Sequence, residues 1–253
     1  MSYAGSVTIV DGLVPVNSQD FPLVNARHVY VDDNTRLSDF VETVTGQIDD
    51  INYIPIAINS LSITTPTSGI AEIGSTISSI TYSYSCSKKP DTLTFNGTSI
   101  STPAASGSGL TLSGLSVTAN RSFTMQATDH GSNSNPSLTV TRSVSLYFYN
   151  KIHWGVAAAP ASYNNAFLLT TLGNHELASS KAKTFTVNAG SEQYIFFALP
   201  TSMGTPTFKV GGFDGGFTKA AEFSHTNASG GTATYAVYKS DNANLGSTTV
   251  VVS

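Results

Sequence analysis

The chain of 253 residues has very little cysteine and few charged side chains. Cys86 is the only cysteine, so an intramolecular disulfide and a cysteine-based zinc site are both excluded. Charged residues make up 11% of the chain, against about 25% in an ordinary soluble domain. Serine and threonine take their place, which suits strands with uncharged outer faces. Lysine and arginine cluster only at Lys88-Lys89, so the sequence predicts no nucleic-acid partner.

Long apolar runs are also missing. No stretch approaches the roughly 18 consecutive apolar residues that a membrane-spanning helix needs. Residues 1–12, MSYAGSVTIVDG, lack the basic start and the long apolar core of a secretory signal. We therefore expect a protein that is made in a cytoplasm and does not insert into a membrane.

Motifs of catalysis and metal binding are absent as well. The five histidines show no metal-ligand spacing; they are His28, His130, His153, His175 and His225. No phosphate-binding loop, dinucleotide fingerprint or nucleophile elbow occurs. A pair of carboxylates for glycoside hydrolysis would have to converge across a cleft, which the sequence does not indicate. We predict a protein that is not an enzyme, with no catalytic residues, no metal and no cofactor.

Residues 32–58 carry the one convincing helical pattern. Apolar residues recur there at alternating spacings of four and three, which is the heptad seam of a coiled coil. Leu37, Val44 and Ile51 take the d positions, and Val41 and Ile48 take the a positions. The helix is expected from about residue 35 to about residue 52, with Asn34 or Asp33 as its N-cap.

The predicted helix needs a partner surface, because a helix this short is marginal in water. β-branched residues at the a positions, with isoleucine also at a d position, favour three strands over two. The pattern therefore predicts a homotrimer with this helix as its coiled coil. The alternative is that the helix packs on a sheet of its own chain.

The rest of the chain reads as short strands separated by turn signals, which predicts a mainly β protein. Residues 59–150 contain about seven strands, among them a hairpin at Asn96-Gly97, and this spacing predicts an immunoglobulin-like β-sandwich. Residues 151–165 form a junction. Residues 166–253 are expected to form a second β-sandwich, which begins with a strand over residues 166–171.

The N-terminal part is divided in two. Residues 1–32 offer few apolar positions for a core, so they are expected to form an extended arm lying on another protein. The alternative is one or two strands added to the chain's own sheet. Residues 33–58 comprise the predicted trimerisation helix and an extended connector.

Aromatic and amide side chains in the junction and the last domain suggest contacts with a sugar. A sugar face stacks on an aromatic ring, and asparagine side chains hydrogen-bond its hydroxyls. The candidates are Trp154, Tyr163, Asn164, Asn165, Phe213 and Tyr238. The alternative is that these rings belong to sandwich cores and that Trp154 locks the two β domains together.

Residues 11–44, DGLVPVNSQDFPLVNARHVYVDDNTRLSDFVETV, resemble the attachment region of fibre proteins of tailed bacteriophages, the head-fibre type above all. The central block, with Phe95-Asn96-Gly97 and the exit KIHWG over residues 151–155, is similar to sandwich domains of phage virion proteins. The phrase YIFFALPTSM, residues 194–203, is similar to the tip domains of phage fibres. The resemblance implies a homotrimer that is attached to the virion by its N-terminus and exposes its C-terminal end.

These observations together lead us to expect a structural virion protein, a head or tail fibre on the virion surface. Its N-terminal arm would dock on another virion structural protein of the capsid, tail or baseplate, with Asp20, Phe21, Pro22 and Leu23 as the anchor. Its β domains would contact polysaccharides of the host surface. The alternatives are a capsid decoration protein without receptor binding, a glycan-degrading tip, and a bacterial adhesin, which would require an export signal.

Overall fold

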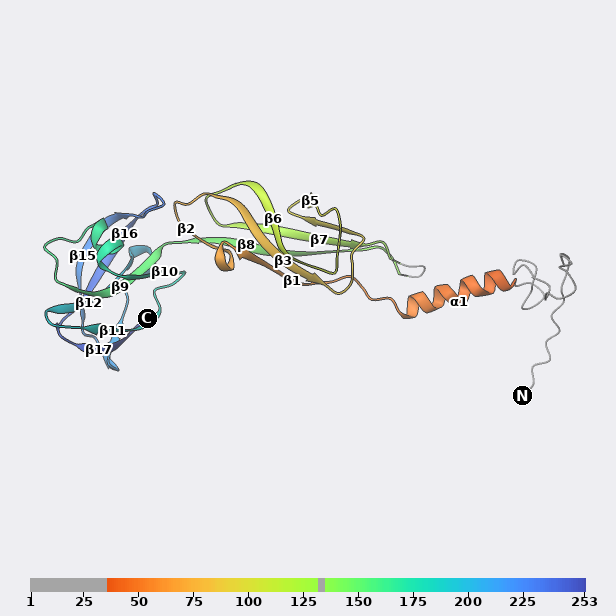
Figure 1. The fold of residues 1–253 in the computed structure, drawn as a ribbon. Coiled ribbons are helices and arrows are strands. Elements are labelled where there is room, and N and C mark those ends of the chain that lie inside the picture. Colours follow the sequence, from red (N-terminus) through yellow and green to blue (C-terminus); the bar gives the residue numbers. More distant parts are fainter. Residues whose placement is uncertain (1–35, 132–134) are drawn as a thin grey trace, which may run out of the picture. The chain divides into compact units, whose positions relative to one another are not determined.

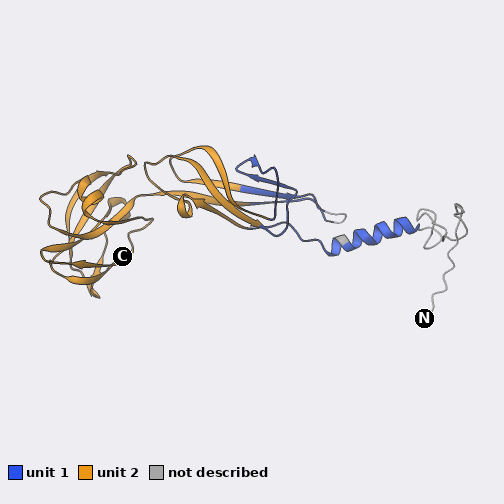
Figure 2. Ribbon diagram, viewed as in Figure 1, with its two compact units in different colours: residues 1–59, 86–105, 125–141 blue, residues 60–85, 106–124, 142–253 orange. Residues whose placement is uncertain are grey.

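The computed structural model describes residues 36–131 and 135–253, apart from the side chain of Asp49. The described chain is mainly β, with one short α-helix (Figure 1). It divides into two compact units (Figure 2). The first contains residues 86–105, 125–141 and the described part of 1–59, and the second contains residues 60–85, 106–124 and 142–253.

Helix α1 (Leu37–Ile51) belongs to the first unit. Its N-cap is Arg36, which has extended backbone angles and makes no side-chain capping hydrogen bond, so the predicted N-cap at Asn34 or Asp33 is wrong. Asp39 in the first turn complements the positive end of the helix dipole in place of a cap. At the C-terminal end of the helix, the N–H of Asn52 donates to the carbonyl of Ile48 at 3.1 Å. Among the described helices, none is long and apolar enough to span a bilayer.

The hairpin predicted at Asn96-Gly97 is confirmed. It joins β4 (Thr92–Phe95) to β5 (Thr98–Ser99), and both turn residues have positive φ, 51° and 79°. A type I′ turn needs this conformation at its two central residues, which is why Asn-Gly favours it.

Residues 58–149 contribute two sheets. One has the strand order β1-β3-β6, and the other has the order β2-β8-β7-β4-β5. The bounds are β1 (Ile58–Thr65), β2 (Ile70–Glu72), β3 (Ile77–Cys86), β6 (Ser106–Val117), β7 (Arg121–Asp129) and β8 (Leu138–Tyr149), with a 3-10 turn η2 (Thr67–Gly69) between β1 and β2. β2 pairs with β8 in parallel, whereas β1 pairs with the other sheet. The consecutive strands β1 and β2 therefore belong to different sheets.

Hydroxyl side chains link neighbouring strands on the outer faces of the sheets. Ser122 and Thr124 on β7 face Ser145 and Ser143 on β8, with oxygen–oxygen distances of 2.8 and 2.9 Å. Thr128 and Thr139 repeat the arrangement at 3.0 Å within the first unit. Cross-strand pairs of this kind stabilise a sheet without any charge. They give a structural reason for the abundance of serine and threonine in the chain.

The C-terminal region of the second unit contains two further sheets around one apolar core. The orders are β10-β9-β12-β16-β15 and β11-β17-β13-β14. The core lies between these sheets; Phe185, Phe197, Phe208, Tyr238 and Val250 are among its buried residues. The bounds are β9 (Lys151–Ala158), β10 (Asn174–Leu177), β11 (Lys183–Ala189), β12 (Gln193–Pro200), β13 (Phe208–Val210), β14 (Phe213–Asp214), β15 (Phe217–Thr226), β16 (Thr232–Ser240) and β17 (Gly246–Val252).

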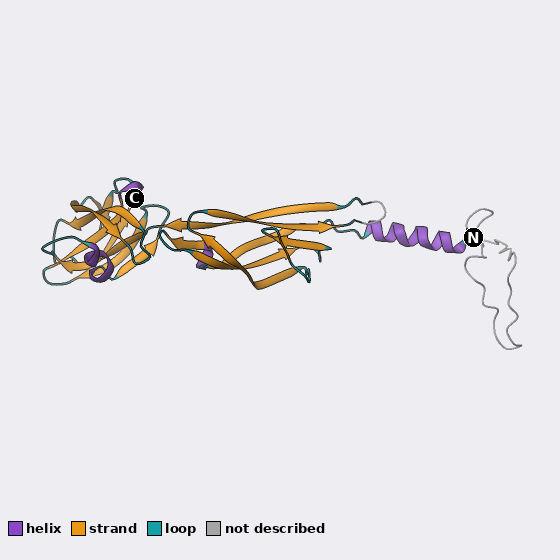
Figure 3. Cartoon of the chain, turned by 90° about the horizontal axis from the view of Figure 1, so that it is seen from above, coloured by secondary structure: helices purple, strands orange, loops and turns teal. Residues whose placement is uncertain are grey.

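The other face of the five-stranded sheet is also buried. Phe167, Leu168 and Leu172 cover it and form a second core with Phe196 and Val237. Phe167 and Leu168 belong to a π-helical segment, η3 (Phe167–Thr171), one of the helical segments marked in Figure 3. The strand predicted over residues 166–171 is therefore wrong. A side-chain oxygen of Asn164 accepts the N–H of Phe167 at 3.1 Å, which favours a helical start over a strand.

Residues 151–165 are predicted to be a junction, but their first half is a strand. Lys151–Ala158 form β9, which runs between β10 and β12 inside the five-stranded sheet. Both faces of this strand are covered, with Ile152 in one core and Ala157 in the other. A strand buried on both faces lacks the alternation of apolar and polar residues by which strands are recognised.

Within the second unit, the turn after β2 and the turn between β15 and β16 are joined by Asn227. Its amide nitrogen donates to the carbonyl of Ile73 at 2.7 Å, and its side-chain oxygen accepts the N–H groups of Ser229 and Gly231 at 3.0 and 2.8 Å. A Cβ atom on Gly231 would lie 2.4 Å from the Ile73 carbonyl oxygen, so the approach requires glycine. Glu72 accepts from Lys151 beside it at 3.2 Å.

Replacing Asn227 with alanine should destabilise the second unit. The substitution leaves the partly buried N–H and C=O groups described above without this partner, which costs about 1–3 kcal/mol. Urea unfolding followed by the fluorescence of Trp154, the only tryptophan, measures this. Asn242→Ala, at an exposed position, is the control and should unfold like the wild type. Equal stability of the two variants would show that the Asn227 contacts contribute nothing.

Candidate functional site

The apolar stripe of α1 is left uncovered by the described chain. We use the name seam for Leu37, Val41, Val44, Ile48 and Ile51. Val41 and Ile48 are each 51% exposed and Ile51 is 83% exposed, whereas Leu37 and Val44 are half-buried. Phe40, at the g position beside the seam, adds an aromatic ring that is 45% exposed and that the heptad pattern alone does not single out. No described segment covers this stripe, so the helix is not seated on a described sheet of its own chain.

The predicted virion anchor cannot be placed. Asp20, Phe21, Pro22 and Leu23 lie outside the described residues, and so does the rest of the predicted arm. The connector after α1 is described, and Ser87 holds it in place. The Ser87 hydroxyl donates to the carbonyl of Pro55 at 2.8 Å and accepts the N–H of Ala57 at 2.9 Å.

Two of the six predicted sugar contacts belong to the core between the C-terminal sheets. The ring of Trp154 lies 5.8 Å from that of Phe185, and the ammonium of Lys183 lies 4.5 Å from its centroid. Tyr238 is 8% exposed and packs on Phe208, with ring centroids 5.3 Å apart. Both rings take part in packing, and Trp154 makes its ring contacts inside this core.

The two asparagines of the set make structural hydrogen bonds. Asn164 accepts the N–H of Phe167, the first residue of η3, as described above. The side-chain oxygen of Asn165 accepts the N–H of Thr226 at 3.1 Å and lies 3.0 Å from Nδ1 of His225. Asn165 thus ties the segment before η3 to the end of β15.

Phe213 and Tyr163 remain as rings that reach the surface. Phe213 is 81% exposed on the β13–β14 hairpin. Tyr163 is half-buried, with its ring edge-on to Phe167 and Phe196 at centroid distances of 5.2 and 6.2 Å. The structure does not bring the six predicted residues together into one site.

Tyr163 lines a cavity of about 400 Å³ in the C-terminal region. Its other lining residues are Thr218, Ala220, Lys239 and Asp241, and none of them is among the predicted contacts. The Thr218 hydroxyl donates to the Asp241 carboxylate at 2.5 Å. Lys239 holds its ammonium 4.2 Å from the ring centroid of Tyr194. Thr218 and Ala220 come from the edge strand β15, Lys239 and Asp241 from the end of β16 and just beyond it, and Tyr163 from the segment before η3, so no single short motif in the sequence indicates this grouping.

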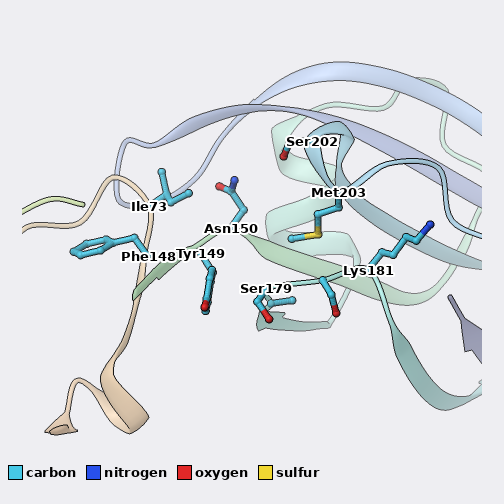
Figure 4. A pocket seen from close by; sticks show the side chains of 10 residues that line it. Ile73, Phe148, Tyr149, Asn150, Ser179, Lys181, Ser202 and Met203 are labelled. Atoms are coloured by element: carbon cyan, nitrogen blue, oxygen red, sulfur yellow. The ribbon is translucent and has the colours of Figure 1, made fainter. Parts of the chain in front are cut away.

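A second cavity, of about 500 Å³, lies where β8 passes into β9 (Figure 4). Its lining comes from the end of β8, the β10–β11 loop and the 3-10 turn η4 (Thr201–Met203). Tyr149, Ser179, Ser202 and Met203 are among the lining residues, and no lining residue is acidic. Lys181 also lines it, but its ammonium donates to the carbonyl of Thr205 at 2.6 Å. The cavity offers hydroxyl groups and apolar surface without a concentration of charge.

Three histidines that are distant in sequence lie together in the second unit. The ring of His153 is 5.7 Å from that of His175 and 5.8 Å from that of His225. Both ring nitrogens of His153 and Nε2 of His225 are buried without a hydrogen-bond partner among the described residues. Among those residues, no three histidine, cysteine or acidic side chains are arranged to hold a metal ion.

Burial keeps these two histidines neutral. Desolvation, together with the neighbouring His225, His175 and Lys151, lowers the pKa of His153 to about 3. Desolvation also lowers the pKa of His225, while the Glu72 carboxylate acts in the opposite direction. Isolated histidines in a sequence carry no sign of such a cluster, and it was not predicted.

Among the described residues of the first unit, Asp129 is the one buried charged group. Its carboxylate accepts from Lys88 at 2.6 Å and from the hydroxyl of Tyr53 at 2.5 Å. These hydrogen bonds, that of Lys88 foremost, lower the pKa of Asp129 to about 2. The carboxylate is saturated by neighbours within the fold, so this cluster is structural. Cys86, at the end of β3, is buried, and burial raises the pKa of its thiol.

The second unit should lose stability in acid. An unfolded histidine takes up a proton below its ordinary pKa of 6.5, whereas folded His153 does so only near pH 3. As the pH falls from about 6.5 toward 3, His153 therefore lowers the free energy of unfolding by up to about 1.4 kcal/mol per pH unit, and His225 acts in the same direction. Urea unfolding by Trp154 fluorescence, repeated between pH 7 and pH 4, measures the slope.

His153→Leu should flatten this pH dependence, because it removes the larger of the two shifts. His130→Gln is the matched control, since His130 is exposed and belongs to the first unit. It should leave the slope unchanged. A wild-type stability that is constant from pH 7 to pH 4 would contradict the buried, neutral state of His153.

Comparison with known proteins identifies no relative. No protein-family model matches the chain, and no curated protein or solved structure shows significant similarity to it. The residues and their geometry are therefore the basis on which a function can be inferred.

Proposed function

We propose that the chain is the subunit of a homotrimeric structural fibre on the surface of a tailed-phage virion. In this proposal, α1 forms the trimer, the N-terminal arm docks on another virion protein, and the β regions are displayed for attachment to host-surface polysaccharide. The single observation that carries it is the seam of α1, which is regular in heptad spacing and uncovered by the described chain.

The seam fits two further copies of the same chain better than an unrelated partner. Identical helices in register present the same positions to one another, which is what a heptad repeat encodes. Val41 and Ile48 at the a positions are β-branched, and Ile51 adds an isoleucine at a d position, a composition that favours three helices. Each fully buried valine or isoleucine contributes about 1.5–3 kcal/mol, which offsets the marginal stability of an isolated short helix.

The strand orders of residues 58–149 support an immunoglobulin-like sandwich as part of this proposal. If β1, β3, β4, β6, β7 and β8 are read as strands A, B, C, E, F and G, the two sheets have the orders A-B-E and G-F-C of that architecture. β2, which pairs in parallel with β8, would be the second half of strand A. Modules of this kind serve in many unrelated proteins, so they indicate a display scaffold and no specific ligand.

The low charge of the chain and its hydroxyl-paired sheet faces suit a scaffold that presents one contact region repeatedly. Weak sites on a trimer, and many trimers on one particle, bind a surface of repeated sugars through avidity. A fibre of this kind needs neither catalysis nor a cofactor.

Electron microscopy of intact particles labelled through this chain tests the proposed function. We expect label at projections from the capsid, tail or baseplate, and particles without the chain that adsorb poorly to their host. Normal adsorption combined with fragile particles would instead identify a capsid decoration protein. Label absent from the particle would refute a virion role.

The double substitution Val44→Asp/Ile48→Asp should convert the trimer to monomers, because it places two carboxylates in the apolar seam. Sedimentation velocity should then show the 26.5 kDa chain in place of a species three times as heavy. Thr43→Asp is the matched control, since residue 43 is exposed and takes the outward c position beside Val44. An unchanged sedimentation profile of the double variant would exclude the seam as the interface.

A further inference from the structure

The cavity beside Tyr163 lies at the end of a sheet face that is otherwise buried. Tyr235 and Val237 on β16 point into the core under η3. Lys239 is the next residue along β16 on this face, because side chains alternate along a strand. Thr218 on β15 lies directly opposite Lys239 in the antiparallel register. The cavity therefore opens where the apolar face becomes polar.

A β-bulge determines which side chain of β15 faces the cavity. Lys219 pairs with Tyr238 and Ala221 with Val237, so Ala220 is an extra residue without a partner on β16. Ala221 packs in the core under η3, whereas Phe217 packs in the core between the sheets. Phe217 and Ala221 are four residues apart, and side chains alternate along a regular strand, so without the bulge both would lie on the same face of the sheet.

As a result, Thr218 takes the place at the cavity that Lys219 would occupy in a strand without the bulge. Strict alternation from Ala221 would direct Lys219 to this face, whereas the bulge brings Thr218 there. Lys219 instead pairs with Glu222 on the exposed strand. Bulges are frequent beside binding sites because they redirect one side chain in this way.

The polar groups of the cavity have unused hydrogen-bonding capacity. Lys239 and Asp241 carry opposite charges and line the same space, yet they form no ion pair with each other in the described structure. Asp241 accepts from Thr218 through one carboxylate oxygen, and a carboxylate has two. Tyr163 adds a half-buried ring to the same lining.

This set of groups selects the chemistry of a ligand. A polyol offers hydroxyl donors to Asp241, ether and hydroxyl acceptors to Lys239, and a C–H face to the ring of Tyr163. A ligand with a net charge is attracted by one of Lys239 and Asp241 and repelled by the other, so these two charges give it no net electrostatic advantage. The volume of about 400 Å³ lies within the usual range of small-molecule sites, about 300–1,000 Å³.

We propose that the cavity formed by Tyr163, Thr218, Ala220, Lys239 and Asp241 is a binding site for a neutral saccharide unit. The choice of a saccharide rests on the proposed role in host-surface attachment. The bulge at Ala220, the Thr218–Asp241 hydrogen bond and the unpaired opposite charges carry the assignment of the site.

Saturation-transfer NMR on the full-length chain tests this site, with D-glucose, D-galactose, N-acetylglucosamine and L-rhamnose as separate millimolar probes. N-Acetylneuraminic acid, glucosamine and alanine represent anionic, cationic and zwitterionic ligands. We expect transfer to at least one neutral sugar and to none of the charged probes. Asp241→Asn should weaken that binding about tenfold, because a hydrogen bond to a charged group is replaced by one to a neutral amide.

The matched control is Asp214→Asn, which removes an exposed carboxylate from the β13–β14 hairpin outside the cavity. It should bind like the wild type. Lys239→Met should weaken binding as Asp241→Asn does, and unchanged thermal unfolding of both variants shows that their folds are intact. Transfer to no neutral sugar, binding of a charged probe alone, or equal losses in Asp241→Asn and Asp214→Asn would each overturn the assignment.

The molecular mass of the protein in the same samples distinguishes a failure of this inference from a failure of the proposed function. A trimer that is located on the virion but binds no neutral sugar would leave the fibre intact and refute the saccharide site. A monomer that binds a neutral sugar with loss in Asp241→Asn would retain the site and refute the trimeric fibre.

Discussion

The exposed apolar seam of α1 is the constraint on which the proposed assembly depends. A helix of 15 residues has little stability of its own in water, and three of its five seam side chains are half or more exposed. The β regions, in contrast, contain buried cores within single chains. The molecule therefore combines a part that is complete as one chain with a part that requires a partner surface. Self-association through the seam satisfies this requirement with the fewest additional components.

The β regions obtain their stability with few charges. Apolar cores fill the interior of the C-terminal sheets, and hydroxyl pairs such as Ser122–Ser145 connect neighbouring strands outside. Buried charge is rare, and Asp129 is neutralised by Lys88 at 2.6 Å. Against this background, polar groups with unused bonding capacity are exceptional. His153 is one such group in the interior, and Lys239 and Asp241, which form no ion pair with each other in the described structure, are two more at the rim of the cavity.

Local patterns in the sequence predict those parts of the fold that local physics determines. The heptad spacing identifies α1, and Asn96-Gly97 identifies its hairpin because only a few residue types accept positive φ. Tertiary contacts determine the rest. Residues 167–171 form η3 because Asn164 accepts the N–H of Phe167 and because the first two side chains of the segment cover a sheet. Strand β9 is not recognisable in the sequence because both its faces are buried. The candidate site is similarly hidden, since the bulge at Ala220 appears only when β15 is paired with β16.

Amide hydrogen exchange in α1, measured over a series of protein concentrations, tests the central claim most directly. If copies of the chain cover the seam, the amides of residues 41–51 should be protected at high concentration and lose protection on dilution, while those of β12 and β16 stay protected throughout. Strong protection of α1 that does not change with concentration, in a species of one chain, would contradict the account, because the helix would then be stable without a second copy.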